Sequence, residues 1–377
     1  MKKYLSLILV LLFCGQMTAQ NAEQSKTILF LIPFYSNQYD GAALANVNAS
    51  ESVNTINSFQ LMGFWAGVQI ALDEYDKKGV PLKVVVRDVS NSESKLRSIM
   101  ENNALMRDVD LIVGPFFTKL FNIAAGYARQ YKIPIVNPFT NRTDILQNNE
   151  YVFKPTSSLE ARPAMVAYMS DKHSNSQIIL YSDTVNKVKD REYISYVNYF
   201  KAHNIKYKVI APKTALAAAL SKDKYNVVVV LNQNDEAKML MIARDLVYNA
   251  NLDNLLLVVP EEWMSSKTFD IEYYSKLNLH FFSDYYIDPT SEQTMLFVHK
   301  YVEKFSAPPT TDNFAYQGYD MVRFFVEYIL NDEDLDRVKV VPVSQTYGFD
   351  KIENGGYENE SVHLLEVKDN QVVPVGF

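Results

Sequence analysis

Asp110 to Phe139 reads DLIVGPFFTKLFNIAAGYARQYKIPIVNPF, in which two short apolar runs flank a segment of helical periodicity. The runs DLIV and IPIV have the composition of buried parallel strands. Between them, apolar residues recur at steps of three and four, which predicts a helix from Leu120 to Tyr131. The stretch is therefore predicted to be a βαβ unit. Its loops at 116–119 and 137–141 follow the carboxyl ends of parallel strands, where open α/β sheets bind ligands.

The alternation of strand and helix extends to both sides of this unit. Before it, the sequence predicts strands at 27–33 and 82–87 and helices at 59–78 and 94–106. After it, the sequence predicts strands at 177–181, 206–210, 225–231 and 255–259, and helices at 191–203, 235–248, 291–305 and 316–330. Gly63 and Gly67 lie four residues apart in the first helix. We expect them to allow that helix to approach the sheet closely.

Two segments interrupt the series and are expected to cross between lobes. Tyr151 to Ser158 is extended and contains a proline, and a second crossing is expected near 280–286. The fold class is therefore predicted to be α/β, with two doubly wound parallel-sheet lobes. We assign residues 27–150 and 284–332 to lobe 1, and residues 151–283 and 333–377 to lobe 2.

The first twenty residues have the features of a secretory signal peptide. Lys2 and Lys3 precede an apolar run from Tyr4 to Phe13, and Ala19 suits cleavage. The run is shorter than the roughly 20 apolar residues that span a bilayer. We therefore expect residues 1–20 to be removed, and the mature chain to reach the periplasm or cell envelope without a membrane span.

Cys14 is the single cysteine of the chain. The stretch LLFC partly resembles the bacterial lipobox, but the bulky Phe13 occupies a position where a small residue is expected, so lipid anchoring at Cys14 is not expected. A mature chain without cysteine forms neither disulfides nor thiolate metal sites. The formal net charge of -7 argues against a nucleic-acid partner.

Motifs of catalysis and of cofactor binding are absent from the sequence. It contains no GxSxG elbow, no P-loop, no HExxH and no glycine-rich dinucleotide turn. None of the histidines has the spacing of metal ligands: His173, His203, His280, His299 and His363. We therefore expect a protein that is not an enzyme and that uses no cofactor or metal.

Short motifs occur in a characteristic order along nearly all of the mature chain. They are FWAG at 64–67, VGP at 113–115, IPIVNP at 133–138, YVFK at 151–154, YQGYD at 316–320 and GFD at 348–350. Their order resembles the type I periplasmic binding proteins, which include branched-chain amino-acid-binding proteins and receptor ligand-binding regions. The resemblance implies three crossings between the lobes. LIPFY at 31–35 and the following polar loop look most like Bacteroidetes envelope proteins associated with LysM modules.

The resemblance also assigns candidate ligand-binding residues. In amino-acid-binding members, hydroxyl and backbone groups after two first-lobe strands hold the ligand carboxylate, and an acidic residue of the second lobe pairs with the ammonium. The matching positions are Thr118, the loop of Phe139, Thr140 and Asn141, and Glu261. A solvated loop carboxylate is the alternative interpretation of Glu261, and Glu262 is a second candidate for the same role.

The sequence departs from the binding members in the second lobe. Residues 182–187 lack the aromatic that usually closes over the ligand, and residues 232–235 offer amides instead. Two functions therefore remain open. The first is a solute-binding protein that closes its lobes over a small polar ligand, such as an amino acid, and delivers it to an ABC transporter or receptor. The alternative is an envelope scaffold or regulator related to cell-wall synthesis, in which the same fold binds a protein.

Overall fold

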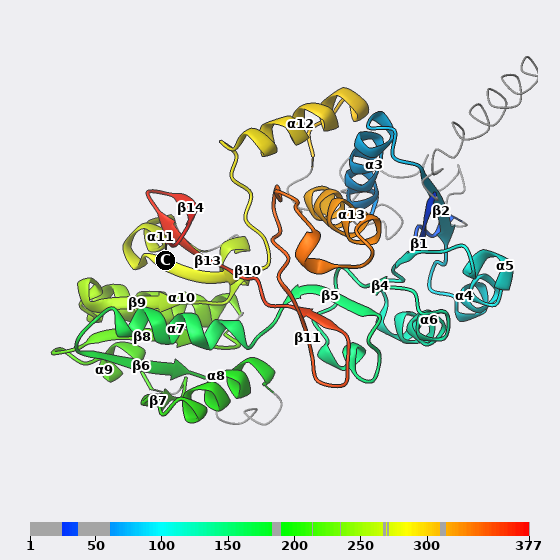
Figure 1. Cartoon of the computed structure of the whole chain (residues 1–377). Helices are drawn as coiled ribbons and strands as arrows, with labels where there is room; N and C mark the ends of the chain where they lie inside the picture. The colour runs from blue at the N-terminus through cyan, green and yellow to red at the C-terminus, as the bar shows by residue number, and fades with distance from the viewer. Residues whose placement is uncertain are drawn as a thin grey trace, which may run out of the picture. The chain divides into compact units, whose positions relative to one another are not determined.

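The computed structural model describes residues 25–36, 61–182, 190–212, 214–233, 235–266, 269, 271–309 and 314–376. The expected signal peptide, Cys14, nearly all of the long polar loop and residues 183–189 lie outside these ranges. The described residues form two compact units, one comprising those up to Val136 with Lys300–Val340 and the other Asn137–His299 with Val341–Phe377. Their strands build two mostly parallel sheets with helices packed against them (Figure 1), which confirms the predicted fold class. The lobe boundaries stay a prediction.

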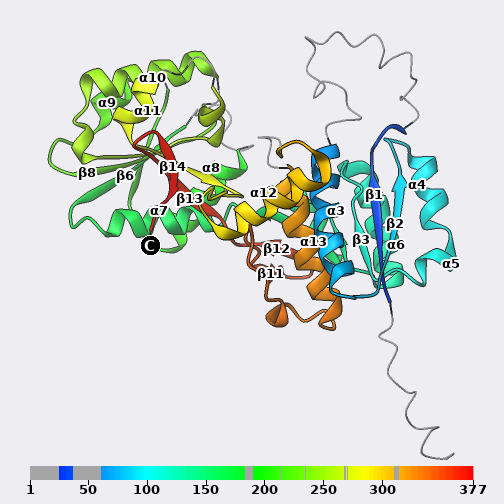
Figure 2. The same cartoon turned by 90° about the horizontal axis from the view of Figure 1, so that it is seen from above.

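The first unit contains the amino-terminal strands in the order β2-β1-β3-β4, all parallel. The strands are β1 (Lys26–Ile32), β2 (Leu82–Asp88), β3 (Leu111–Val113) and β4 (Ile135–Val136). The helices are α3 (Met62–Lys77), α4 (Glu93–Met100), α5 (Asn103–Met106), α6 (Thr118–Tyr131) and α13 (Phe314–Leu330), followed by the short η6 (Leu335–Arg337). Figure 2 shows α3 and α13 on one face of these strands and α4, α5 and α6 on the other. The central βαβ unit is therefore β3-α6-β4, as predicted.

Two expectations for this unit were wrong in detail. The helix predicted at 94–106 is two helices, because the Asn102 side chain accepts a hydrogen bond from the Leu105 backbone and starts α5 anew. The close approach at Gly67 is to a helix and not to the sheet. A Cβ atom on Gly67 would lie 1.8 Å from the Ala315 carbonyl oxygen, and one on Gly318 would lie 2.2 Å from that of Phe64. The backbones of α3 and α13 are therefore in contact.

The second unit contains a seven-stranded sheet in the order β14-β13-β10-β9-β8-β6-β7. Its strands are β6 (Ser176–Tyr181), β7 (Tyr207–Ile210), β8 (Tyr225–Val230), β9 (Leu255–Val258), β10 (Leu279–Ser283), β13 (His363–Lys368) and β14 (Gln371–Pro374). Strands β7 to β10 run parallel to β6, and β13 is antiparallel to β10 and to β14. Part of the expected crossing at 280–286 is thus a strand of this sheet. The unit also contains β5 (Val152–Ser157), β12 (Tyr357–Asn359) and β11 (Phe349–Lys351), in which β12 pairs in parallel with β5.

Helices cover both faces of the seven-stranded sheet. On one face lie α7 (Ala161–Asp171) and α8 (Arg191–Ala202), and on the other α9 (Leu216–Ala219), α10 (Glu236–Asn249) and α11 (Ile271–Leu277). The short turns η4 (Leu252–Asn254) and η5 (Glu261–Ser265) flank β9, and α12 (Glu292–Phe305) follows β10. The turn η3 (Thr143–Leu146) contacts β5 and β12 instead. Helix α7 was not predicted. The carboxyl ends of β8, β9 and β10 lie at one edge of the sheet, because the three strands are parallel.

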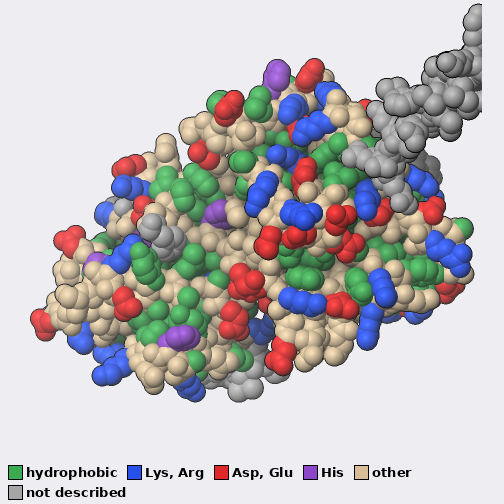
Figure 3. All heavy atoms as spheres, viewed as in Figure 1, with side chains coloured by type: hydrophobic (Ala, Val, Ile, Leu, Met, Phe, Trp, Pro, Cys, Tyr) green, Lys and Arg blue, Asp and Glu red, His purple; other side chains and the backbone are tan. Residues whose placement is uncertain are grey.

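Charges of both signs are interspersed over the face of the molecule seen in Figure 3. Among the described residues, no helix is both long enough and apolar enough to cross a membrane.

Candidate functional site

A pocket of about 410 Å³ lies at this edge of the second unit. Apolar residues at the ends of β8, β9 and β10 form part of its wall, and they include Val230, Val259 and Phe282. The rest of the wall is polar. Its charged members are Asp190, Glu192, Glu261, Glu262, Asp284 and Glu358, with Lys154, Arg162 and Arg191.

Glu261 lines the pocket as the first residue of η5, after Val259 and Pro260, which follow β9. The turn is anchored by Trp263, which is fully buried and whose Nε1 donates to the Gln233 carbonyl oxygen at 2.9 Å. The Glu261 carboxylate is half-buried and accepts a hydrogen bond from Ser283 Oγ at 2.7 Å. Burial raises the pKa of this carboxyl, and the charge of Asp284 raises it further. The carboxylate is therefore not the freely solvated loop group of the alternative interpretation.

Asp284 follows the last residue of β10 and lies beside the same pocket. Its Oδ1 accepts hydrogen bonds from both the backbone amide, at 3.0 Å, and the hydroxyl of Ser157 at the end of β5. Ser283, its neighbour in the chain, donates to Glu261. The end of β10 thus places two carboxylates at the same pocket, because Ser283 donates to Glu261 and the next residue is Asp284 itself.

Arg162 and Glu192 bring the first turns of α7 and α8 together. Arg162 Nη1 donates to Glu192 Oε1 at 2.8 Å, and the guanidinium lies 5.6 Å from the centroid of the Phe282 ring. Burial alone lowers the pKa of Arg162, but the adjacent Glu192 carboxylate reverses this effect and raises the pKa overall. Within the described part of the chain, Arg162 Nε and the Tyr196 hydroxyl are buried without a hydrogen-bond partner.

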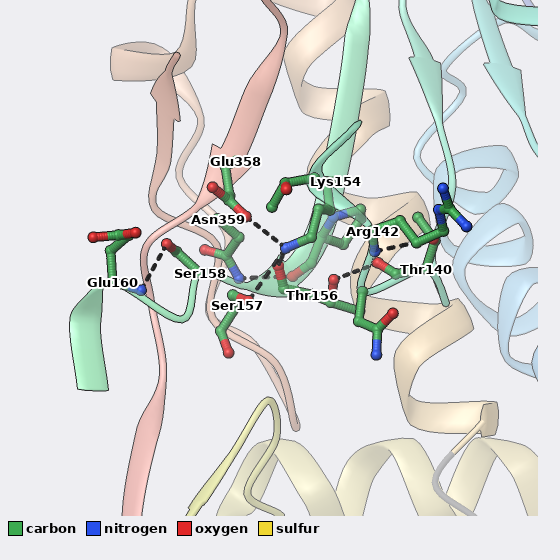
Figure 4. Close-up of polar contacts among 12 residues, drawn as sticks. Thr140, Arg142, Lys154, Thr156, Ser157, Ser158, Glu160, Glu358 and Asn359 are labelled. Carbon is green, nitrogen blue, oxygen red and sulfur yellow. Dashed lines mark hydrogen bonds and ion pairs between the residues drawn. The ribbon is translucent and has the colours of Figure 1, made fainter. Parts of the chain in front are cut away.

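A buried ion pair forms another part of the wall. Lys154 of β5 and Glu358 of β12 face each other in register, with Nζ 2.8 Å from Glu358 Oε1 (Figure 4). The same Nζ donates to the carbonyl oxygens of Thr156 at 2.8 Å and Ser157 at 3.2 Å. The neighbouring Asn359 is fully buried and donates through Nδ2 to the Pro155 carbonyl oxygen at 2.8 Å. These bonds fix the end of β5, which carries Ser157.

The loop predicted to hold a carboxylate lies next to this wall. Asn141 lines the pocket, and its carbonyl accepts from Arg191 Nη1 at 3.4 Å. Thr140 is buried; its hydroxyl accepts from the Arg142 amide at 3.3 Å, and its carbonyl accepts from the Thr156 hydroxyl at 2.6 Å. Phe139 is half-buried and does not line the pocket.

The structure brings only some of the predicted residues into one pocket. Asn141, Glu261 and Glu262 line it, whereas Thr118 begins α6 in the first unit. The ligand-binding roles of Thr118, Phe139, Thr140, Asn141 and Glu261 stay predictions.

Sequence reasoning missed Arg162, Glu192 and Asp284. Arg162 lies in the helix α7 that was not predicted, and Asp284 lies in a segment that was interpreted as a crossing. A signal was available for Glu192, because Asp190 caps α8 by accepting from the Tyr193 amide at 3.0 Å. Aspartate is a preferred helix N-cap, and a helix that follows a parallel strand begins at the carboxyl edge of the sheet, where doubly wound folds bind ligands.

Comparison with known proteins identifies the family of this sequence. The family model for periplasmic binding proteins matches residues 55–359. No curated protein matches the sequence. The narrower resemblance to LysM-associated envelope proteins receives no support.

Three solved structures illustrate the likeness of fold. A putative branched-chain amino acid ABC transporter from Rhodospirillum rubrum covers 93% of this chain and 100% of its own length, with a TM-score of 0.66 and 13% identity. An ABC transporter substrate-binding protein from Desulfitobacterium hafniense covers the same shares, with a TM-score of 0.58 and 16% identity. Full-length LpoA from Haemophilus influenzae matches 93% of this chain over 59% of its own, with a TM-score of 0.58 and 12% identity. Because the family model spans well over half of the sequence and both sheets have the expected topology, the chain belongs to the type I periplasmic binding protein family.

Proposed function

We propose that the chain is an exported solute-binding protein of the periplasm or cell envelope, which closes its two lobes over a small polar ligand such as an amino acid. In this proposal it presents the ligand to an ABC permease or receptor and catalyses no reaction. Membership of the family supports the proposal. So does the pocket, because its volume of about 410 Å³ falls within the roughly 300 to 1,000 Å³ typical of small-molecule sites.

The observation that carries the proposal is the environment of Glu261. Its carboxylate is half-buried in the pocket wall and accepts a hydrogen bond from the neutral hydroxyl of Ser283. Burial and the nearby Asp284 both disfavour its ionised form. A ligand ammonium placed against it would reverse that penalty. Asn141 supplies a polar group for the rest of the ligand, and Thr118 and Thr140 remain the proposed partners of a ligand carboxylate.

A ligand screen with a local reporter tests this function. The chain has two tryptophans, so Trp65→Phe leaves Trp263, two residues after Glu261, as the single fluorescent reporter. Amino acids, peptides and cell-wall fragments are first screened for a rise in melting temperature, and binders are then titrated by tryptophan fluorescence.

The matched variants are Glu261→Gln in the pocket and Glu353→Gln at an exposed position. Removing one partner of a buried charge pair costs about 2 to 5 kcal/mol, so Glu261→Gln should weaken binding more than about tenfold. Glu353→Gln should leave the affinity unchanged. Equal affinity in wild type and Glu261→Gln contradicts the proposed site.

A second candidate function is the envelope scaffold. The observation in its favour is that cations of the pocket are already engaged inside the protein: Lys154 with Glu358, Arg162 with Glu192, and Arg191 Nη2 with the Thr143 hydroxyl at 2.5 Å. Cations engaged in this way need no anionic ligand group to be stable. If no compound of the screen binds, while cross-linking in the cell envelope repeatedly captures one protein, the scaffold function is favoured.

A further inference from the structure

The described side chains that line the pocket carry an excess of negative charge. Six of them are carboxylates and three are cations, a formal balance of −3 when all are ionised. Lys154 and Arg162 each pair with one carboxylate, Glu358 and Glu192 respectively, at 2.8 Å. Those two pairs are neutral overall. The remaining carboxylates therefore exceed the one remaining cation, Arg191.

Glu261 and Asp284 are the unpaired carboxylates whose environment is best defined. Within the described part of the chain, neither forms an ion pair, and their donors are the neutral groups of Ser283 and Ser157. The neutral donors supply no positive charge. The charge of Arg162 does act on both carboxylates, since it lowers the pKa of Glu261 and its own pKa is raised in part by Asp284, but this guanidinium is already paired with Glu192. The negative charge of Asp284 also adds to the effect of burial in disfavouring the ionised form of Glu261.

We infer that the pocket selects a small organic cation, with a protonated amine held between Glu261 and Asp284 and a net positive charge on the ligand as a whole. This inference rests on the proposed solute-binding function and specifies its ligand. A neutral zwitterion brings one amine and one carboxylate, so it leaves the excess negative charge of the pocket wall unchanged. A ligand with a second amine, or with an amine and no carboxylate, compensates the surplus.

The apolar part of the wall sets the shape of this cation. Val230, Val259 and Phe282 line the pocket beside the carboxylates, and all three are buried side chains at strand ends. They suit a chain of methylene groups. The volume of about 410 Å³ is also far larger than a bare metal ion needs. An aliphatic diamine or a dibasic amino acid fits both the charge and the apolar wall.

A calorimetric series that changes charge at nearly constant length tests the inference. The probes are cadaverine, lysine, norleucine and 2-aminoadipate, with calcium chloride alone as the metal control. The expected result is binding of cadaverine or lysine at least about tenfold tighter than norleucine, with 2-aminoadipate the weakest. Asp284→Asn should weaken lysine more than about tenfold and reduce the preference for lysine over norleucine, whereas Glu353→Gln should change neither.

The outcomes separate this inference from the proposed function. Norleucine or 2-aminoadipate binding as tightly as lysine overturns the cation inference and leaves solute binding intact. An unchanged preference for lysine in Asp284→Asn also overturns it. If calcium binds and none of the amines does, the inference that the ligand is an organic cation is overturned. If neither this series nor the larger library contains a binder, both the inference and the proposed function fail.

Discussion

Replacing Glu358 by glutamine should destabilise the second unit strongly, because Lys154 is only 1% exposed. The variant keeps an oxygen acceptor near Nζ, together with the Thr156 and Ser157 carbonyls, but it removes the carboxylate that is bonded to the ammonium. Breaking a buried ion pair from one side costs about 3 to 5 kcal/mol. Since glutamine preserves an acceptor, we expect a loss of about 3 kcal/mol in the free energy of unfolding.

The measurement is urea unfolding without ligand, followed by Trp263 fluorescence in the Trp65→Phe background, because Trp263 lies in the second unit. The control is Glu150→Gln in the pair with Lys351, whose side chains are 59% and 47% exposed. Exposed pairs contribute about 0 to 1 kcal/mol, so the control should change little.

A double variant checks the cause. Lys154→Met with Glu358→Leu removes both charges and leaves two carbonyl oxygens without their donor, at about 1 kcal/mol each. The double variant should therefore lose less free energy of unfolding than the sum of the losses measured for Lys154→Met alone and Glu358→Leu alone. A change below about 0.5 kcal/mol in Glu358→Gln would refute the reasoning, as would a double variant that loses the full sum.

Three further predictions concern other parts of the chain. Gly67→Ala should lower the melting temperature, at a cost of about 1 to 3 kcal/mol or more, because its Cβ would overlap the Ala315 backbone of α13. Gly126→Ala, whose Cβ would meet no atom within 4 Å apart from its own helix backbone and chain neighbours, should instead stabilise α6 by about 0.5 to 1 kcal/mol. Glu261→Gln should be at least as stable as wild type at pH 7. Burial raises the pKa of Glu261, so its ionised form is disfavoured in the folded state. A marked loss of stability in urea unfolding would contradict this prediction. Burial lowers the pKa of His280, and the opposing effects of the Asn278 carbonyl and Glu366 do not reverse this. The unfolded state therefore binds the proton more readily, so the free energy of unfolding should fall as pH drops below about 6.5. His280→Asn should flatten this fall, and an identical pH profile for both proteins would count against the prediction.

The fold could be read from the sequence because its central strands, unlike the partly exposed β2 and β7, are buried along almost their whole length. Such strands appear as unbroken apolar runs, as in β1, where Ile28 to Ile32 are all buried. Helix α6 was equally visible, because its buried residues keep a regular period. Helix α7 was not, since its small and apolar residues are not confined to one stripe and a proline lies in its first turn.

The candidate site was less accessible to sequence reasoning. Glu261 was singled out because the family resemblance places an acidic residue after this second-lobe strand, and that position depends only on local order along the chain. The contacts of Lys154 with Glu358 and of Ser157 with Asp284 join residues separated by 204 and 127 positions. No periodicity records such pairings, because they follow from the arrangement of strands in space. Arg162 was missed for the additional reason that its helix was missed.

A crystal structure of the protein with its tightest calorimetric ligand tests the central claim most directly. The account predicts a small organic cation in the pocket lined by Glu261 and Asp284, with a protonated amine within hydrogen-bond distance of both carboxylates. A ligand bound at another surface, or one whose carboxylate rather than its amine faces Glu261, would contradict it.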